Sequence, residues 1–148
     1  MTAQINFSDA VTDAQTTNDD LRGAAYHEAG HVVVARFLGL TIGKIEIEED
    51  GSGRADTSSA EHLPLIDQVA LCVAGMEAQA LFNCPTHERV AFSDYGKVSE
   101  LVAGLTEEES REIRNSAYLR ALEILKGRLP EVQRLAEQLI KQRCIDAT

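Results

Sequence analysis

The sequence predicts a mainly helical domain of the α+β class that contains one small β-hairpin or sheet. Three observations predict this class. Apolar residues recur at helical spacing along most of the chain, a short stretch at residues 44–48 alternates apolar and charged residues as a half-buried strand does, and a length of 148 residues is ordinary for one domain. The hydrophobic share is 44% and only 5% of the residues are aromatic, so we expect a core built mainly from Ala, Leu, Val and Ile.

The N-terminal part of the chain divides into a polar segment and a long helix. Residues 1–16 are polar, so we expect a flexible N-terminal segment before a single domain that covers residues 17–148. A helix is expected over about residues 19–38, because two aspartates suit its positive end and apolar spacing then continues along it. Gly39 follows as a suitable C-terminal cap.

The rest of the chain is predicted to form a hairpin followed by helices. Ile45 and Ile47 alternate with charged residues, "DGSG" is turn material, and "RADTSS" is predicted as a second short strand. Helical spacing returns in "LPLIDQVALCVAGMEAQALF", where Pro64 fits the first turn. "NCPTHERVAF" is expected to be a loop. Three helical segments are then expected over residues 93–105, 106–129 and 130–145, with Thr106 as the N-cap of the second and Pro130 at the start of the third.

Charge and cysteine usage limit the classes of partner and the compartment. Lysine plus arginine give 14 positive charges and aspartate plus glutamate give 24 negative charges, so the net charge is −10. Such a surface repels phosphate backbones and anionic lipid, so no nucleic-acid partner is expected. The three cysteines, Cys72, Cys84 and Cys144, form no CxxC pair and are expected to be reduced thiols of a cytoplasmic protein. No stretch approaches the roughly 18 apolar residues of a membrane span, so direct membrane insertion is not expected.

One apolar helix carries an unusual set of polar residues. Within "AAYHEAGHVVVARFLG", residues 24–39, His27 and His31 are four positions apart and therefore project from the same helix face. Two imidazoles in this arrangement can bind one metal ion at Zn–N distances of about 2.0 to 2.1 Å. Glu28, rotated by about 100° from His27, is poorly aimed as a ligand but can reach a water on that metal. An HExxH helix of this kind provides two zinc ligands and a general base.

The residues around the motif argue against a solvated helix face. Apolar residues flank it on both sides, and burying two histidines and a glutamate without a partner is costly. Zinc is therefore the expected cofactor. Gly30 lowers helix propensity by roughly 1 kcal/mol relative to Ala, and we expect it to let another backbone approach closely beside the metal.

The HEAGH segment resembles the zinc helix of the FtsH-type ATP-dependent metalloproteases, the M41 peptidases. The order of the later segments extends the resemblance over about residues 20–145, because "VAGMEAQALF" is similar to the second long helix of that family and "FSDYGKVSELV" to its aspartate segment. The resemblance implies a small sheet after the zinc helix and paired helices at the end of the domain. It also implies a third zinc ligand from an aspartate at the start of a helix.

The chain departs from the family pattern in its second helix and in its length. Met76 and Glu77 stand where the family has Arg and Ala, and Gln79 and Ala80 stand where it has two glutamates. The stretch between the second histidine and the aspartate is shorter than usual in the family. The printed chain also contains no GxxxxGK[ST] motif, so we expect that it does not unfold substrates by itself.

A catalytic zinc usually has three protein ligands plus water, so a further ligand is expected. Asp94 is favoured because the resemblance implies it, although an aspartate at this position could instead serve as a helix N-cap. Glu77 is the next candidate, either as a ligand or as an acceptor for a histidine N–H. His87, His62 and Glu61 complete the set of candidates.

Together these observations predict a zinc-dependent metalloendopeptidase that hydrolyses unfolded or flexible peptides, with Glu28 as the general base. The alternative is a non-proteolytic zinc-binding interaction or regulatory domain derived from an FtsH-like peptidase. The expected partners are peptide or unfolded protein substrates and a separate ATPase or unfoldase, and a homo-oligomer is compatible with the sequence. The retained Glu28 favours the enzyme, whereas the altered second helix favours the interaction domain.

Overall fold

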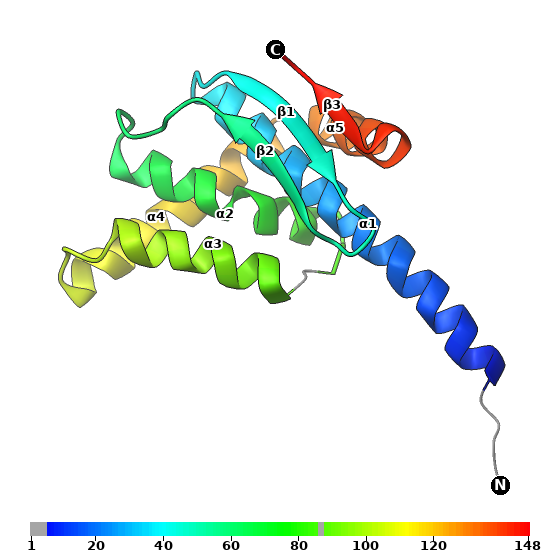
Figure 1. Ribbon diagram of the computed structural model, residues 1–148. Helices are drawn as coiled ribbons and strands as arrows, with labels where there is room; N and C mark the ends of the chain where they lie inside the picture. The colour runs from blue at the N-terminus through cyan, green and yellow to red at the C-terminus, as the bar shows by residue number, and fades with distance from the viewer. Residues whose placement is uncertain (1–5, 86–87) are drawn as a thin grey trace, which may run out of the picture.

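A computed structural model describes residues 6–85 and 88–148 of the chain (Figure 1). In this part the elements follow in the order α1 (Asn6–Phe37), β1 (Ile42–Ile47), β2 (Gly53–Thr57), α2 (Leu65–Leu81), α3 (Glu88–Leu101), α4 (Glu107–Lys126), α5 (Leu129–Gln142) and β3 (Cys144–Asp146). The prediction of a mainly helical protein with one small antiparallel sheet is confirmed. None of the described helices combines the length and apolar character needed to cross a membrane.

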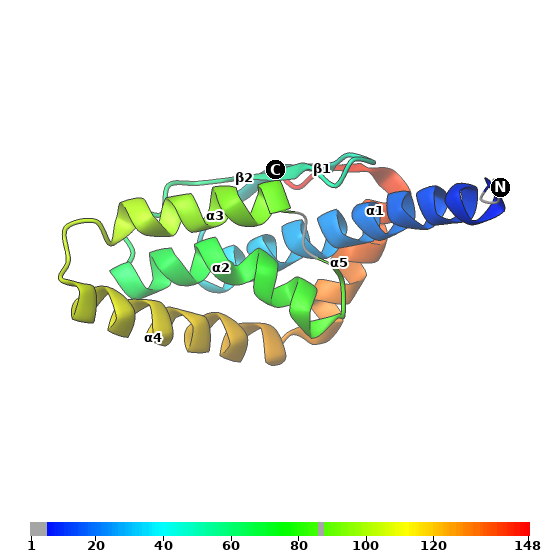
Figure 2. The ribbon, with the colours of Figure 1, turned by 90° about the horizontal axis from the view of Figure 1, so that it is seen from below.

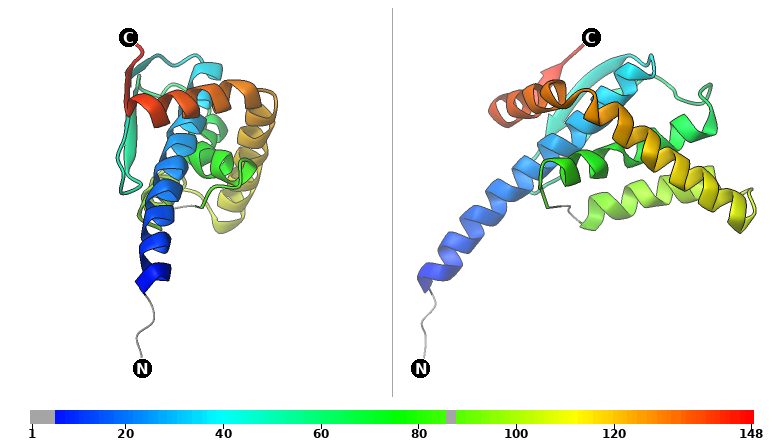
Figure 3. Two further views of the ribbon diagram at one scale, coloured as in Figure 1. Left: turned by 90° about the vertical axis from the view of Figure 1, so that its right-hand side faces the viewer. Right: turned by 180° about the vertical axis from the view of Figure 1, so that it is seen from behind.

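Helix α1 is the central element of the fold. It packs most extensively against α2 and α5, and α2 packs in turn against α4. Figure 2 shows the sheet as a thin layer on one side and α4 on the opposite side, with α1 and α2 between them. Figure 3 shows α5 lying across α1 beside the sheet. Both faces of α1 are thereby covered, which explains why its apolar residues are buried on all sides around the HEAGH segment.

Helix α1 begins at Asn6, earlier than the expected position near residue 19. Residues 6–18 contain neither glycine nor proline, so nothing in this stretch interrupts the helix backbone. The segment expected to be flexible therefore includes residues whose backbone is helical, and this part of α1 extends beyond the body of the fold (Figure 1). At the other end Gly39 has φ +86°, the left-handed conformation expected of a C-terminal cap.

The sheet contains the expected hairpin and one strand that was not expected. β1 pairs antiparallel with β2, and the strand order is β2-β1-β3. The prediction that the last helix reaches residue 145 is wrong, because α5 ends at Gln142 and Arg143 turns left-handed with φ 65°. This turn lets β3 lie beside β1, where Ile145 is paired with the fully buried Ile45.

The helices after the hairpin follow the predicted order with one shifted boundary. Helix α3 begins at Glu88, not at residue 93, so Asp94 lies inside the helix and not at its N-terminus. The alternative reading of Asp94 as an N-cap is therefore wrong. The predicted N-cap Thr106 is confirmed, since its hydroxyl accepts a hydrogen bond from the Glu109 amide and the Glu109 carboxylate accepts one from the Thr106 amide.

Candidate metal centre

The two histidines of α1 converge on one point. His27 and His31 are one turn apart on the helix, and their Nε2 atoms lie 3.0 Å from each other. His27 is 3% exposed, and His31 is partly buried beside it. The four-residue spacing has thus brought both imidazoles to the same site.

Asp94 of α3 completes the cluster. Its Oδ2 atom lies 2.9 Å from His27 Nε2 and 3.4 Å from His31 Nε2. For a tetrahedral zinc with Zn–N distances near 2.0 Å, neighbouring ligand atoms are about 3.3 Å apart. The three measured separations are close to this value, so the residues present fit a small cation such as zinc.

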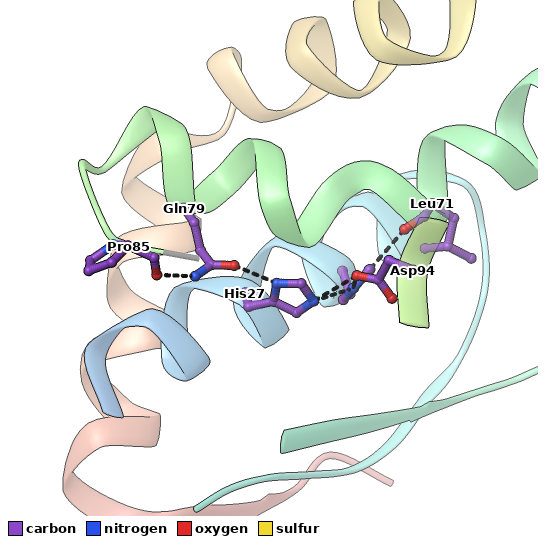
Figure 4. Close-up of polar contacts among 6 residues, drawn as sticks. His27, Leu71, Gln79, Pro85 and Asp94 are labelled. Carbon is purple, nitrogen blue, oxygen red and sulfur yellow. Dashed lines mark hydrogen bonds and ion pairs between the residues drawn. The ribbon is translucent and has the colours of Figure 1, made fainter. Parts of the chain in front are cut away.

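Two fixed acceptors determine which nitrogen of each histidine carries the proton. His27 Nδ1 lies 2.6 Å from Gln79 Oε1, and His31 Nδ1 lies 2.8 Å from the carbonyl oxygen of Leu71. Gln79 is held in this orientation because its Nε2 donates to the carbonyl oxygen of Pro85 at 2.7 Å (Figure 4). Both acceptors require Nδ1–H on the imidazole, so in the neutral histidines both Nε2 lone pairs face the cluster.

The cluster therefore requires positive charge between its atoms. With both protons on Nδ1, two imidazole lone pairs and a carboxylate oxygen meet without a donor, and Asp94 Oδ2 is buried without a hydrogen-bond partner. Either protons on Nε2 or a metal ion would relieve this repulsion. Burial alone would raise the pKa of Asp94, but the hydrogen bonds that His27 and His31 donate when they carry a proton on Nε2 outweigh burial and hold this pKa well below its ordinary value.

The surroundings of His31 also favour a positive charge on its ring. Burial disfavours the imidazolium, but the hydrogen bond to Asp94 and the charge of Glu28 outweigh burial and raise the pKa of His31. The negative groups around the two histidines thus favour a cation at the centre in either form. A divalent ion can bind all three acceptor atoms at once, whereas a single proton can be shared by only two of them.

Glu28 lies beside the cluster without belonging to it. The side chain is 6% exposed and lines the same cleft as the two histidines. Burial raises the pKa of the Glu28 carboxyl, and the nearby histidines oppose this rise. The carboxylate is therefore a stronger base than an exposed glutamate, which is the property a general base requires.

Close contacts at three glycines bring these elements together. A Cβ at Gly30 would lie 2.6 Å from the carbonyl oxygen of Ala74 on α2, so the expected close approach of another backbone is confirmed. A Cβ at Gly75 would lie 2.6 Å from atoms of the His27 ring. On the other side, Gly53 of β2 passes over Glu28, with 3.1 Å between its Cβ position and the carboxylate. Larger residues would displace the groups that form the site.

The cluster opens into a cleft of about 490 Å³. Its walls come from the HEAGH part of α1, the strand β2 with the preceding turn, α2 and α3. Thus the two histidines, Glu28 and Asp94 are reachable by a ligand even though three of the four side chains are buried.

The other candidate ligands do not join the cluster. Glu77 is half-buried on α2 and outside the cleft, and burial raises its pKa. His62 and Glu61 are exposed in the segment before α2. His87 lies outside the described residues. Among the described residues, the group that could hold a metal is His27, His31 and Asp94.

Gln79 is the site residue that the sequence did not predict. It is two positions from Glu77, which we expected as a histidine acceptor, and is one helical turn from Gly75, the residue that contacts His27. A signal was present in the chain, because Gln79 stands where the resembling family has a glutamate. Gln79 is 2% exposed, and both the oxygen and the nitrogen of its side-chain amide form hydrogen bonds.

Comparisons with protein-family models and with curated proteins found no match to this chain. The resemblance of the HEAGH helix to the FtsH-type peptidases therefore stays a prediction. Function is inferred below from the geometry of the cluster and its cleft.

Proposed function

We propose that this protein is a zinc-dependent metalloendopeptidase, similar to the FtsH-type peptidases, that hydrolyses unfolded or flexible peptides. The observation that carries the proposal is the meeting of His27, His31 and Asp94 at separations of 2.9 to 3.4 Å with Glu28 beside them in one cleft. Two histidines and one carboxylate are a donor set of catalytic zinc sites that leaves a position open. Iron(II) also uses such a set, but a buried glutamate base beside it favours hydrolysis.

In the proposed reaction, the zinc ion and the side chains of the protein would have different roles. A bound zinc ion would supply a water of lowered pKa and polarise the scissile carbonyl. Glu28 would accept a proton from the attacking water as the new carbon–oxygen bond forms. It would then donate this proton to the amine nitrogen as the carbon–nitrogen bond breaks, so that the carboxylate is regenerated. Asp94 and the Gln79–His27 hydrogen bond would keep the imidazoles oriented through the cycle.

The cleft suits an extended peptide. Strand β2 is an edge strand, because β1 pairs with one of its sides and no other described strand pairs with the second. Gly53, Arg54 and Ala55 of this strand line the cleft above Glu28. An unfolded peptide can add to such an edge as a further strand through backbone hydrogen bonds, whereas a stably folded protein cannot. Folded substrates would therefore need a separate ATPase or unfoldase. A cytoplasmic location is part of the proposal and is supported by the three free cysteines.

A comparison of wild type with Glu28→Gln tests the proposal. Glutamine keeps the size of the side chain but cannot accept the proton, so the variant should keep its fold and metal while losing peptide hydrolysis. Loss of a general base commonly lowers the rate by about 10² to 10⁴. The measurements are metal content for zinc and iron, circular dichroism, and cleavage of a fluorogenic unfolded peptide with and without chelator.

Three results would contradict the proposal in different ways. If Glu28→Gln cleaves as fast as wild type, Glu28 is not the base. If zinc-loaded wild type cleaves no unfolded peptide, the chain is better described as a non-proteolytic zinc-binding interaction domain. A protein that retains iron in preference to zinc would point to a different chemistry.

A further inference from the structure

Lys97 is a charged residue of the cleft that the proposed hydrolysis does not use. It is exposed on α3, lines the same cleft as the metal cluster, and follows Asp94 by three residues, so the two side chains leave neighbouring parts of the helix surface. Glu28 of α1 and Leu71 and Cys72 of α2 line this cleft as well. Lys97 therefore belongs to the wall of the cleft into which the metal cluster opens, and a peptide bound there lies within its reach.

Among the described side chains that line the cleft, the other cation is already neutralised. Arg54 of β2 contacts the carboxylates of Glu46 at 3.0 Å and Asp56 at 3.7 Å. Lys97 forms no ion pair with any carboxylate whose side chain the structure describes. Asp50, the acidic residue in the turn before β2, accepts hydrogen bonds from the amide and hydroxyl of Ser52. Lys97 is thus the cation of the described cleft wall that is available to a ligand.

We propose that Lys97 makes this cleft select peptides that present a carboxylate near the scissile bond. The carboxylate would come from an Asp or Glu side chain or from the peptide C-terminus. This inference rests on the proposed function, since it concerns the substrate class of the same cleft.

The net charge of −10 acts against acidic peptides, but only at a distance. At physiological ionic strength the Debye length is about 8 Å, so exposed charges elsewhere on the protein are largely screened from a peptide in the cleft. Direct contact between Lys97 and a carboxylate is screened much less. The local cation therefore decides the preference of bound peptides, while the overall charge slows their approach.

Peptide binding to zinc-loaded Glu28→Gln provides a test that does not depend on cleavage. The probes are fluorescein-labelled, alanine-rich decapeptides with an amidated C-terminus that carry two adjacent glutamates or two adjacent glutamines. Because neighbouring side chains of an extended peptide point to opposite sides, one glutamate of the pair faces Lys97 in either register. A third peptide carries glutamines and a free C-terminal carboxylate. Fluorescence anisotropy gives the dissociation constants.

We expect one of the two carboxylate peptides to bind about fivefold more tightly than the amidated glutamine peptide, the size of a favourable partly exposed ion pair. Addition of Lys97→Met should remove the preference, and Lys97→Glu should reverse it. Addition of Lys126→Met, on the exposed surface of α4 and outside the cleft, should leave it unchanged. Tighter binding of the glutamate peptide identifies a side-chain carboxylate, and tighter binding of the free-terminus peptide identifies the C-terminus.

Equal binding of all three peptides, or a preference that survives Lys97→Met and Lys97→Glu, would overturn the inference. These results are separable from the proposed hydrolysis. A Lys97-dependent preference without any cleavage by wild type would contradict the peptidase and support the binding inference. Cleavage by wild type without a Lys97-dependent preference would support the peptidase and contradict the binding inference.

Discussion

Replacement of Gln79 should weaken metal binding even though Gln79 is not a ligand. Its Oε1 accepts the proton of His27 Nδ1 at 2.6 Å, and its Nε2 donates to the Pro85 carbonyl at 2.7 Å. Gln79→Leu removes both bonds and leaves the buried Nδ1–H of His27 without a partner. His27 can then protonate Nε2 instead, which blocks the atom that faces Asp94.

The expected loss is considerable for a residue that does not contact the metal. Removing the hydrogen-bond partner of a metal-binding histidine typically lowers metal affinity by about 10- to 100-fold, or about 1.4 to 2.7 kcal/mol. The metal-free protein should also lose about 2 to 4 kcal/mol of unfolding free energy, because two hydrogen bonds and the pairing of one buried donor are removed. Competition with a chromogenic zinc chelator measures the first effect, and urea denaturation in excess chelator measures the second.

Gln79→Glu separates the two roles of the amide. A carboxylate still accepts from His27 and increases its basicity, so zinc affinity should be retained. The second carboxylate oxygen would face the Pro85 carbonyl oxygen, where the wild type has a donor, so the metal-free protein should be less stable than wild type. Gln68→Leu is the matched control, because Gln68 likewise donates from its amide nitrogen to backbone carbonyl oxygens of the segment before α2 but lies outside the cleft. The reasoning is refuted if folded Gln79→Leu binds zinc as tightly as wild type.

Three further predictions follow from other parts of the structure. Asp94→Ala should lose zinc on dialysis while remaining folded, as shown by metal analysis, and full zinc retention would remove Asp94 from the ligand set. Gly30→Ala should destabilise the fold by about 1 to 3 kcal/mol in urea denaturation, although alanine favours helix more than glycine, because the added Cβ would contact α2 at 2.5 to 2.6 Å. Gly96→Ala, on the open side of α3, is the control and should stabilise the fold by up to about 1 kcal/mol. At pH 8 the exposed Cys144 should be alkylated first and Cys72 slowly, because burial raises the pKa of Cys72 to about 11 and leaves little thiolate at pH 8. Equal alkylation rates of the two cysteines, measured by mass spectrometry, would contradict this prediction.

The parts of the site that depend on local helix geometry were predictable from the sequence. His27, Glu28 and His31 lie within one and a half turns of a single helix, so their spacing alone fixes how they project. Asp94 is separated from His31 in the sequence by β1, β2 and α2, and only the resemblance to a known family singled it out. Its position inside α3 was not predicted, because the boundary of that helix carries no strong capping signal in the sequence.

The parts that depend on tertiary packing were not predictable. Gln79 meets His27 only because α1 and α2 approach closely at Gly30, and no pattern within α2 alone distinguishes Gln79 from Glu77. Strand β3 is three residues long and exists through its pairing with β1, so its sequence contains no period to detect. The start of α1 was placed too late because residues 6–18 are polar and contain no helix breaker, so the sequence marks no helix boundary there.

The close packing of α1 and α2 connects the metal site to the core. Gly30 and Gly75 each lower helix propensity by about 1 kcal/mol, yet any larger side chain there would separate the helices or displace His27. Both acceptors that fix the histidine tautomers, Gln79 and the Leu71 carbonyl, belong to α2. A shift of α2 relative to α1 therefore changes both acceptor distances at once, although it moves neither histidine along its own helix. It follows that substitutions in the α1–α2 interface that leave every ligand in place should still alter metal affinity, and that this affinity reports how well the two helices are packed.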